Sequence, residues 1–243
     1  MNRCSILCVA ALTAVAGTLA IAQPAKDKPA TKPTAAPAAQ PEVKPALPDA
    51  TPKMDMQLPP GFTPEMMKAC MDAATPGPMH ELMAKGVGTW KGTSTMWMAP
   101  GTEPIKTESL ATVKNILGGR FNTLEVKGEF PGMGPFEGFA ISGYDNVSKK
   151  FYMTWADNFG TGMMIGTGEI SSDHSTITWD LTFNCPVDKT AKKFREIDKH
   201  HADGTMTVEM FGPDMVTGKE FKMMEITYTR VPEAKPATAP KGM

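Results

Sequence analysis

The chain has 243 residues, with 25 Lys and Arg against 26 Asp and Glu and a formal net charge of −1. This near-neutral balance argues against an electrostatic nucleic-acid binder, which needs an excess of positive charge. Every Phe, Trp and Tyr lies between Phe62 and Tyr228, which predicts one aromatic-bearing block of about 170 residues, enough for a single domain with its own core.

Residues 1–22 have the pattern of a signal peptide. Arg3 is followed by an apolar run and then by the sequence Ala-Ile-Ala, which ends at Ala22 and fits a cleavage site for secretion. The apolar run is shorter than the ~20 residues that a membrane-spanning helix needs. The sequence therefore predicts cleavage near Ala22, a secreted or periplasmic location in the cell envelope, and no transmembrane segment in the mature chain.

Residues 23–60 consist mostly of Pro, Ala and Lys, with ten prolines and no aromatic residue. Such a segment buries too little apolar area to offset its ordering entropy. It is therefore expected to be a disordered spacer, and residues 231–243 are expected to form a disordered tail.

Two cysteines, Cys70 and Cys185, remain after removal of the signal peptide. A disulfide between them could persist in an oxidising compartment. Equally, both could be unpaired, with Cys185 buried as a small hydrophobe. The sequence leaves both alternatives open.

Residues 61–85 are expected to form a helical lead-in. Thr63 can cap a helix that has Pro64 at its first position. The apolar spacing from Met66 to Met71 places these side chains on one helix face. Pro76 and its neighbours must end this helix, and a second short helix is expected over residues 79–85.

From residue 86 to residue 230 the pattern becomes that of strands. In Thr176–Asn184, apolar Ile, Trp, Leu and Phe alternate with polar residues, as a half-buried strand requires. Turn signals separate about ten such segments, expected at 90–98, 105–117, 120–129, 136–145, 149–157, 163–170, 176–184, 193–202, 205–211 and 220–230. Sequential antiparallel strands of this number favour an all-β, up-and-down β-barrel, with a two-sheet sandwich as the alternative.

Two resemblances point to the same fold. Gly88-Thr89-Trp90 resembles the Gly-x-Trp start of lipocalins and other calycin barrels, in which an arginine on the last strand, here Arg230, packs over the tryptophan. Such a cation on an indole closes one barrel end and contributes about 0.5 to 2 kcal/mol. Gly-Tyr-Asp-Asn at 143–146, Lys-Lys-Phe-Tyr at 149–152 and Trp-Ala-Asp at 155–157, after Gly-Gly-Arg at 118–120, resemble the secreted bacterial proteins grouped as domain of unknown function 1579. That resemblance implies a calycin-like barrel and brings no established reaction.

The leading functional hypothesis is a barrel that binds a small apolar or amphipathic molecule. The expected wall consists of inward apolar and aromatic side chains, with a tyrosine at the barrel mouth: Met153, Trp155, Trp179, Phe183 and Tyr144. The same apolar residues would equally fill a solid core, so the alternative is a structural or interaction protein without a ligand.

Charged residues give a weaker prediction. On the strand expected at 193–202, Arg195 and Lys199 point inward if Ile197 does, and Arg195 could then meet an anionic group. The favoured alternative is that this strand is exposed and that its charges, including Glu196 and Asp198, are solvated. Arg120, after a Gly-Gly turn, is a second candidate contact for an anion.

Catalytic and metal-binding patterns are weak throughout the sequence. The adjacent His200 and His201 point to opposite faces of a strand and cannot chelate one metal in regular geometry. The other two histidines, His80 and His174, lack convergent partners and are expected at the surface. No cofactor or metal is predicted, and an enzyme that uses a lumenal carboxylate with Arg195 or Arg120 is the least favoured hypothesis.

Overall fold

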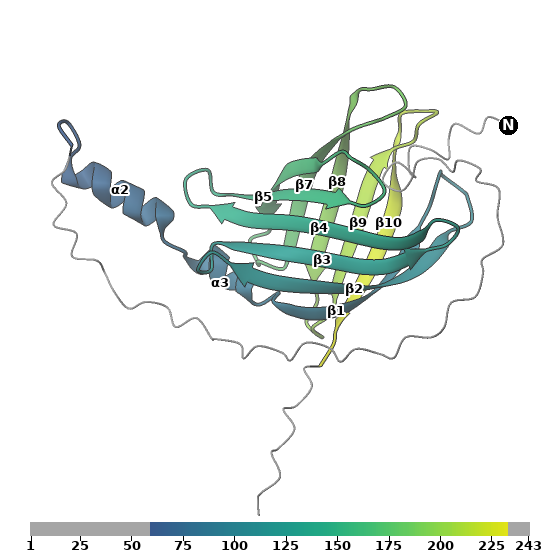
Figure 1. The fold of residues 1–243 in the computed structure, drawn as a ribbon, viewed down its shortest axis with the longest axis horizontal. Coiled ribbons are helices and arrows are strands. Elements are labelled where there is room, and N and C mark those ends of the chain that lie inside the picture. The colour runs from purple at the N-terminus through teal and green to yellow at the C-terminus, as the bar shows by residue number, and fades with distance from the viewer. Residues whose placement is uncertain (1–58, 233–243) are drawn as a thin grey trace, which may run out of the picture. The chain divides into compact units, whose positions relative to one another are not determined.

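The computed structural model describes residues 59–232 (Figure 1). The expected signal peptide lies outside the described residues, as do all but two residues of the expected spacer and all but two of the expected tail. Two short helices, α2 (Pro64–Ala74) and α3 (Pro78–Ala84), precede the strands. The Thr63 hydroxyl accepts a hydrogen bond from the amide of Met66 (3.2 Å), which caps α2 as the sequence predicts.

Ten strands follow, and each pairs antiparallel with the next. The last strand also pairs with the first, so the sheet is a closed barrel (Figure 1). The all-β, up-and-down barrel is therefore confirmed, and the two-sheet sandwich is excluded. The strands are β1 (Gly88–Met96), β2 (Ile105–Ile116), β3 (Phe121–Phe130), β4 (Gly134–Asp145), β5 (Lys150–Asp157), β6 (Met164–Ile170), β7 (Thr176–Asn184), β8 (Ala191–His200), β9 (Met206–Pro213) and β10 (Glu220–Arg230).

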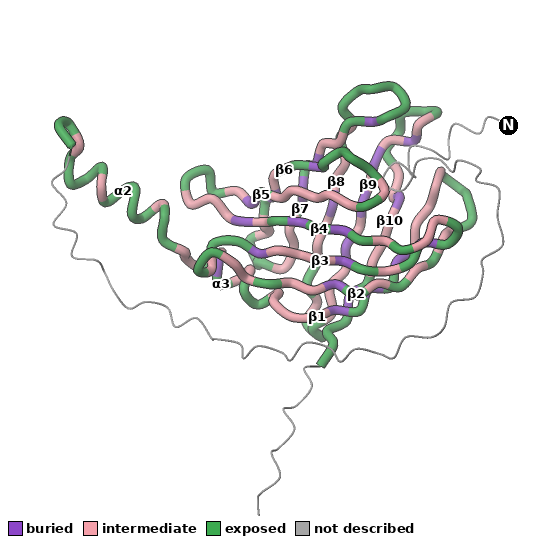
Figure 2. Tube along the Cα trace, viewed as in Figure 1, coloured by how far each residue is buried: buried purple, intermediate pink, exposed green. Residues whose placement is uncertain are grey.

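The period-two pattern decides which side chains fill the barrel. On β7, Trp179 and Leu181 are buried while Thr178 and Asp180 are exposed, and alternating buried and accessible positions recur along the other strands (Figure 2). The inward side chains form two apolar clusters. The first is built on Phe151, Met164, Trp179, Leu181, Met210 and Met223, and the second on Trp90, Ala111, Val126, Val208 and Tyr228.

Arg230 closes the sheet at the end where β1 begins and β10 ends. Its guanidinium carbon lies 4.4 Å from the centroid of the Trp90 ring, and its Nη1 and Nη2 donate to the carbonyls of Val87 and Lys85 (both 2.7 Å). Gly88 makes room for this contact: it has a φ of +137°, and a Cβ there would lie 2.5 Å from Arg230 Nη1. Any larger residue would therefore be strained and would displace the guanidinium.

Helix α3 lies against β3 and β4 at the same end of the barrel (Figure 1). Asn122 on β3 donates its Nδ2 to the carbonyl of Met83 (2.8 Å), and Met79 and Met83 pack against the first apolar cluster. His80, expected at the surface, is instead only 6% exposed. Its ring meets that of Tyr144 edge-on at 6.0 Å, because α3 turns this face toward the barrel.

Candidate ligand site

Two carboxylates of β8 lie inside the barrel. Glu196 is 9% exposed, and Asp198 follows two residues later on the same face of the strand. Trp179, on the neighbouring β7, donates its indole Nε1 to Asp198 Oδ2 (2.8 Å). Asp198 Oδ1 is fully buried and accepts no hydrogen bond from the described part of the chain. The Glu196–Asp198 pair is therefore a polar site within an otherwise apolar interior.

Burial controls the protonation of this pair. Loss of solvation raises the pKa of Glu196 well above its usual range, and the charge of Asp198 and the hydrogen bond between the two groups raise it further. Burial also raises the pKa of Asp198, to about 6, while the hydrogen bonds from Trp179 and Glu196 act in the opposite direction. Both shifts favour the protonated forms, so the pair holds protons more tightly than two exposed carboxylates would.

Aromatic and apolar side chains surround the pair. In the strand register, Glu196 lies opposite Trp179 on β7 and Met210 on β9, and Asp198 lies opposite Val208 on β9. Burial raises the pKa of the Tyr228 phenol on β10, and the negative charges of Glu196 and Asp198 raise it further. This coupling means that the phenol lies within electrostatic reach of both acids.

Large rings lie flat on glycines of adjacent strands. A Cβ on Gly168 would lie 2.7 Å from Trp179 Cε3, and one on Gly138 would lie 2.3 Å from Trp155 Cη2. The rings could not occupy these positions beside any residue larger than glycine. These two glycines therefore fix where the Trp179 and Trp155 rings lie in the interior.

The model of the family described as "Protein of unknown function (DUF1579)" matches residues 75–230. The chain belongs to the DUF1579 family. No curated protein matches the chain. Among solved structures, Rv2717c from M. tuberculosis is similar at 14% sequence identity and a TM-score of 0.48, covering 65% of this chain and 100% of that one.

Four of the expected wall residues of this DUF1579 protein belong to its first apolar cluster. Trp179 is one of the buried residues at its centre, whereas Met153, Trp155 and Phe183 are partly buried and pack against it. Tyr144 also packs against this cluster, with its ring 4.9 Å from that of Phe151. The structure thus brings these five residues together, with Tyr144 near the end that α3 covers.

The two expected anion contacts lie elsewhere. Arg195 is on the outward face of β8, where its Nη2 pairs with Glu220 (2.6 Å) and its guanidinium lies 4.1 Å from the centre of the Phe211 ring. Arg120 donates to the carbonyls of Ala74 (3.1 Å) and Leu117 (3.2 Å). The register of β8 is the reason: Glu196 and Asp198 take the inward positions, so Arg195 and Lys199 cannot.

The sequence interpretation of β8 as solvated on both faces is therefore corrected, and it missed the acid pair. One signal was available, since two acids separated by one residue must share a face of a strand. That signal alone did not say which face points inward.

Cys70 and Cys185 remain thiols rather than forming a disulfide. Cys70 is exposed on α2, whereas Cys185 is buried just after β7.

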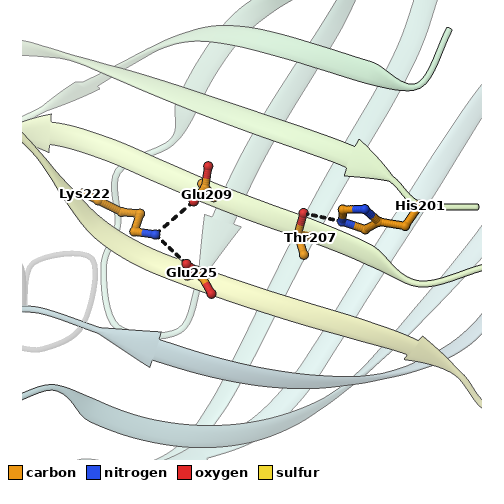
Figure 3. A network of polar contacts seen from close by, with 5 residues as sticks. All are labelled: His201, Thr207, Glu209, Lys222 and Glu225. Atoms are coloured by element: carbon orange, nitrogen blue, oxygen red, sulfur yellow. Dashed lines mark hydrogen bonds and ion pairs between the residues drawn. The ribbon is translucent and has the colours of Figure 1, made fainter. Parts of the chain in front are cut away.

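Among the described residues, several acids on the outer surface have cationic partners, unlike the two acids inside the barrel. Lys222 on β10 donates to Glu209 (2.9 Å) and to Glu225 (Figure 3). Nearby, the His201 Nε2 and the Thr207 hydroxyl are hydrogen-bonded at 2.9 Å (Figure 3). These outward acids have cationic partners and solvent, whereas none of the ion pairs within residues 59–232 involves Glu196 or Asp198.

Two hollows lie away from the acid pair. One, of about 410 Å³, is lined on β3, β4 and β5 by residues including Glu125, Phe139 and Asp157, and the other, of about 250 Å³, by residues including Trp97 and Phe221. Asp157 accepts the indole N–H of Trp155 (3.1 Å), and burial raises its pKa.

Neither a metal cluster nor a spanning helix is found between residues 59 and 232. No group of three or more His, Cys, Asp or Glu side chains there is placed to hold a metal ion. None of the helices in the same residues is long and apolar enough to cross a membrane.

Proposed function

We propose that this DUF1579 protein is exported to the cell envelope and binds a small amphipathic molecule inside its barrel. Support for export comes from the sequence pattern of residues 1–22. Support for binding comes from one observation: beside the buried Glu196 lies the partly buried Asp198, whose Oδ1 is enclosed and has no hydrogen-bond donor in the described part of the chain.

The energetics of burial explain why this observation favours a ligand. An unpaired buried polar group costs about 1 to 3 kcal/mol, and a buried ion costs more unless it is compensated. A barrel that only had to be filled would be more stable with apolar residues at positions 196 and 198. A ligand whose polar end reaches Asp198 Oδ1 would supply the missing partner.

Partly accessible apolar residues are suited to the other end of such a molecule. Met153, Trp155 and Phe183 face the interior but are not fully buried. An apolar chain packed on them would remove their remaining accessible surface from water, at roughly 25 cal/mol per Å². The ligand would thus run from the acid pair along these three side chains.

A filled barrel without a ligand is the second candidate, and a specific observation favours it. Leu181 and Phe151 are only 1% and 2% exposed, so no space the size of a water molecule lies against most of their surface. If the side chains around Leu181 and Phe151 are packed without gaps, the interior is a solid core that contains the acid pair. The two candidates differ in whether anything occupies the barrel in the cell.

The test is mass spectrometry of the protein purified from its host of origin, under native and then denaturing conditions. We expect a stoichiometric small molecule in the native spectrum that is released on denaturation. Phe183→Ala should reduce its occupancy, whereas the matched control Phe121→Ala, on an exposed outer position of β3, should retain it. An empty wild-type protein that binds no amphipathic compound added in excess would refute the proposal and leave the filled barrel.

A further inference from the structure

The acid pair lacks the cation that buried carboxylates normally have. Each acid in the network of Glu209, Glu225 and Lys222 on the outer surface contacts an ammonium group (Figure 3). Inside the barrel, Asp198 accepts from the Trp179 indole at Oδ2 and also interacts with Glu196, while its buried Oδ1 has no hydrogen-bond donor among the described residues. Buried carboxylates are usually paired with cations or neutralised by protonation, and here no ion pair between residues 59 and 232 involves either acid.

We propose that the ligand of this site carries a protonated amine, and that the ammonium group binds between Glu196 and Asp198, at the Asp198 oxygen that has no donor among the described residues. This inference rests on the proposed function and deepens it by giving the chemical class of the ligand's polar end. The ammonium donates one hydrogen bond to Asp198 Oδ1 and another to the carboxylate of Glu196. Charge-assisted bonds of this kind are about twice as strong as neutral ones.

The proton balance follows from the protonation of the pair. Before binding, the raised pKa values of both acids favour a protonated pair. The ammonium enters with its own proton retained, and protons held by the pair leave to the buffer. The pair then carries two negative charges facing one positive charge, and no covalent bond forms or breaks.

The other groups around the pair are compatible with a cation. On β10 the Tyr228 phenol stays neutral at physiological pH, because burial and the two acids raise its pKa. On β7 the facing residue is Trp179, and on β9 the register neighbours are the uncharged Val208 and Met210. On β8 the other titratable groups on the same face are Lys192, which pairs with Asp188, and His200 at the end of the strand, whose pKa is lowered by loss of solvation and by the neighbouring His201.

The same surroundings disfavour the alternatives. A carboxylate or phosphate at this place would bring a further negative charge close to the pair in a medium of low dielectric constant, where like charges repel strongly. A neutral alcohol could donate one hydrogen bond to Asp198 Oδ1 but would not compensate charge. The site should therefore select the polar end of its ligand mainly by charge, and to a lesser extent by its ability to donate a hydrogen bond.

Three compounds with the same apolar chain test this order: octylamine, octanol and octanoate. We expect octylamine to bind about tenfold or more tightly than octanol, which corresponds to the ~1.4 kcal/mol that one decade of affinity requires, and octanoate to bind weakest. Isothermal titration calorimetry at pH 7 in phosphate and in Hepes, whose ionisation enthalpies differ, gives the protons released. Release of protons on binding of octylamine is expected, because a cation between the two acids favours their ionised forms.

Variants of Glu196 and Asp198 test whether these two acids cause the preference for octylamine and the proton release. Asp198→Asn should remove most of the preference for octylamine over octanol and most of the proton release. Glu169→Gln, which changes a solvent-exposed carboxylate on β6, is the matched control and should leave both unchanged. Thermal unfolding of each variant shows whether it is folded, and Glu196→Gln serves as the second lumenal variant if Asp198→Asn does not fold.

The outcomes separate this inference from the proposed function. If octanol or octanoate binds as tightly as octylamine, or if octylamine binds without releasing protons, the ammonium assignment is overturned while the barrel remains a binding protein. If none of the three binds, both the proposed function and the assignment fail. A preference for octylamine that persists in both lumenal variants would also overturn the assignment, because the cation would then bind elsewhere.

Discussion

Substituting Asp198 by Asn should change how the stability of the protein depends on pH. The folded state raises the pKa of Asp198 from 3.8 to about 6, so it holds the proton more tightly than the unfolded state does. The contribution of this group to the free energy of unfolding is therefore largest below pH 4. It falls as the pH rises from 4 to 6 and is level above that.

The size of the effect follows from the shift. A difference of about two pKa units, at 1.36 kcal/mol each, corresponds to roughly 3 kcal/mol. Asp198→Asn keeps an oxygen for the Trp179 indole but cannot ionise. The unfolding free energy of this variant relative to the wild-type protein should therefore rise by about 3 kcal/mol between pH 4 and pH 7.

Urea unfolding followed by tryptophan fluorescence at several pH values measures this difference. Hydrogen bonds within turns lower the pKa of exposed acids such as Asp173 and Asp203, and their contribution has the opposite pH dependence, being lost as the pH falls. Subtracting wild type from variant removes it, because both proteins retain these acids. A difference for Asp198→Asn that is flat or falls with pH would refute the burial of an ionisable pair.

Three further predictions concern the packing of the barrel and the exposure of the two cysteines. Trp90→Ala and Arg230→Ala should be non-additive by about 0.5 to 2 kcal/mol in a double-mutant cycle of unfolding free energies, and simple additivity would contradict the stacking of the two side chains. Gly138→Ala should destabilise the barrel by about 1 to 3 kcal/mol because its methyl group would overlap an indole ring, whereas Gly77→Ala, with open space around it, should have a much smaller effect by the same unfolding assay. Labelling with a thiol reagent should modify Cys70 rapidly in the folded protein and the buried second thiol only on unfolding; equal rates would contradict the difference in burial.

The alternation of apolar and polar residues was enough to predict the strands and their closure. On β7 the inward side chains Trp179 and Leu181 are large and apolar, and the outward Thr178 and Asp180 are polar, so burial and polarity agree. In a ten-strand meander, closure into a barrel then pairs the backbone N–H and C=O groups of the two edge strands. These are local patterns, and one sequence suffices to see them.

The strand β8 could not be assigned in the same way. Arg195, Glu196, Asp198 and Lys199 place charges on both of its faces, so polarity does not say which face is buried. Which face of β8 points inward depends on residues outside the strand: on its register with β7 and β9, and on the hydrogen bond that Trp179 donates to Asp198. The burial of His80 was missed for a similar reason, because it depends on where α3 lies against β3 and β4.

Stability and binding should respond in opposite directions at this site. Replacement of buried ionic groups by neutral ones often leaves a protein equally or more stable, so Asp198→Asn should raise stability near neutral pH. If the acid pair binds the polar end of a ligand, the same variant should lose affinity for it. A residue whose neutralisation stabilises the fold and weakens binding is maintained at a cost in stability, and such a cost is expected for a binding site and not for core packing. Measuring both properties on one variant therefore distinguishes a ligand-binding barrel from a filled one.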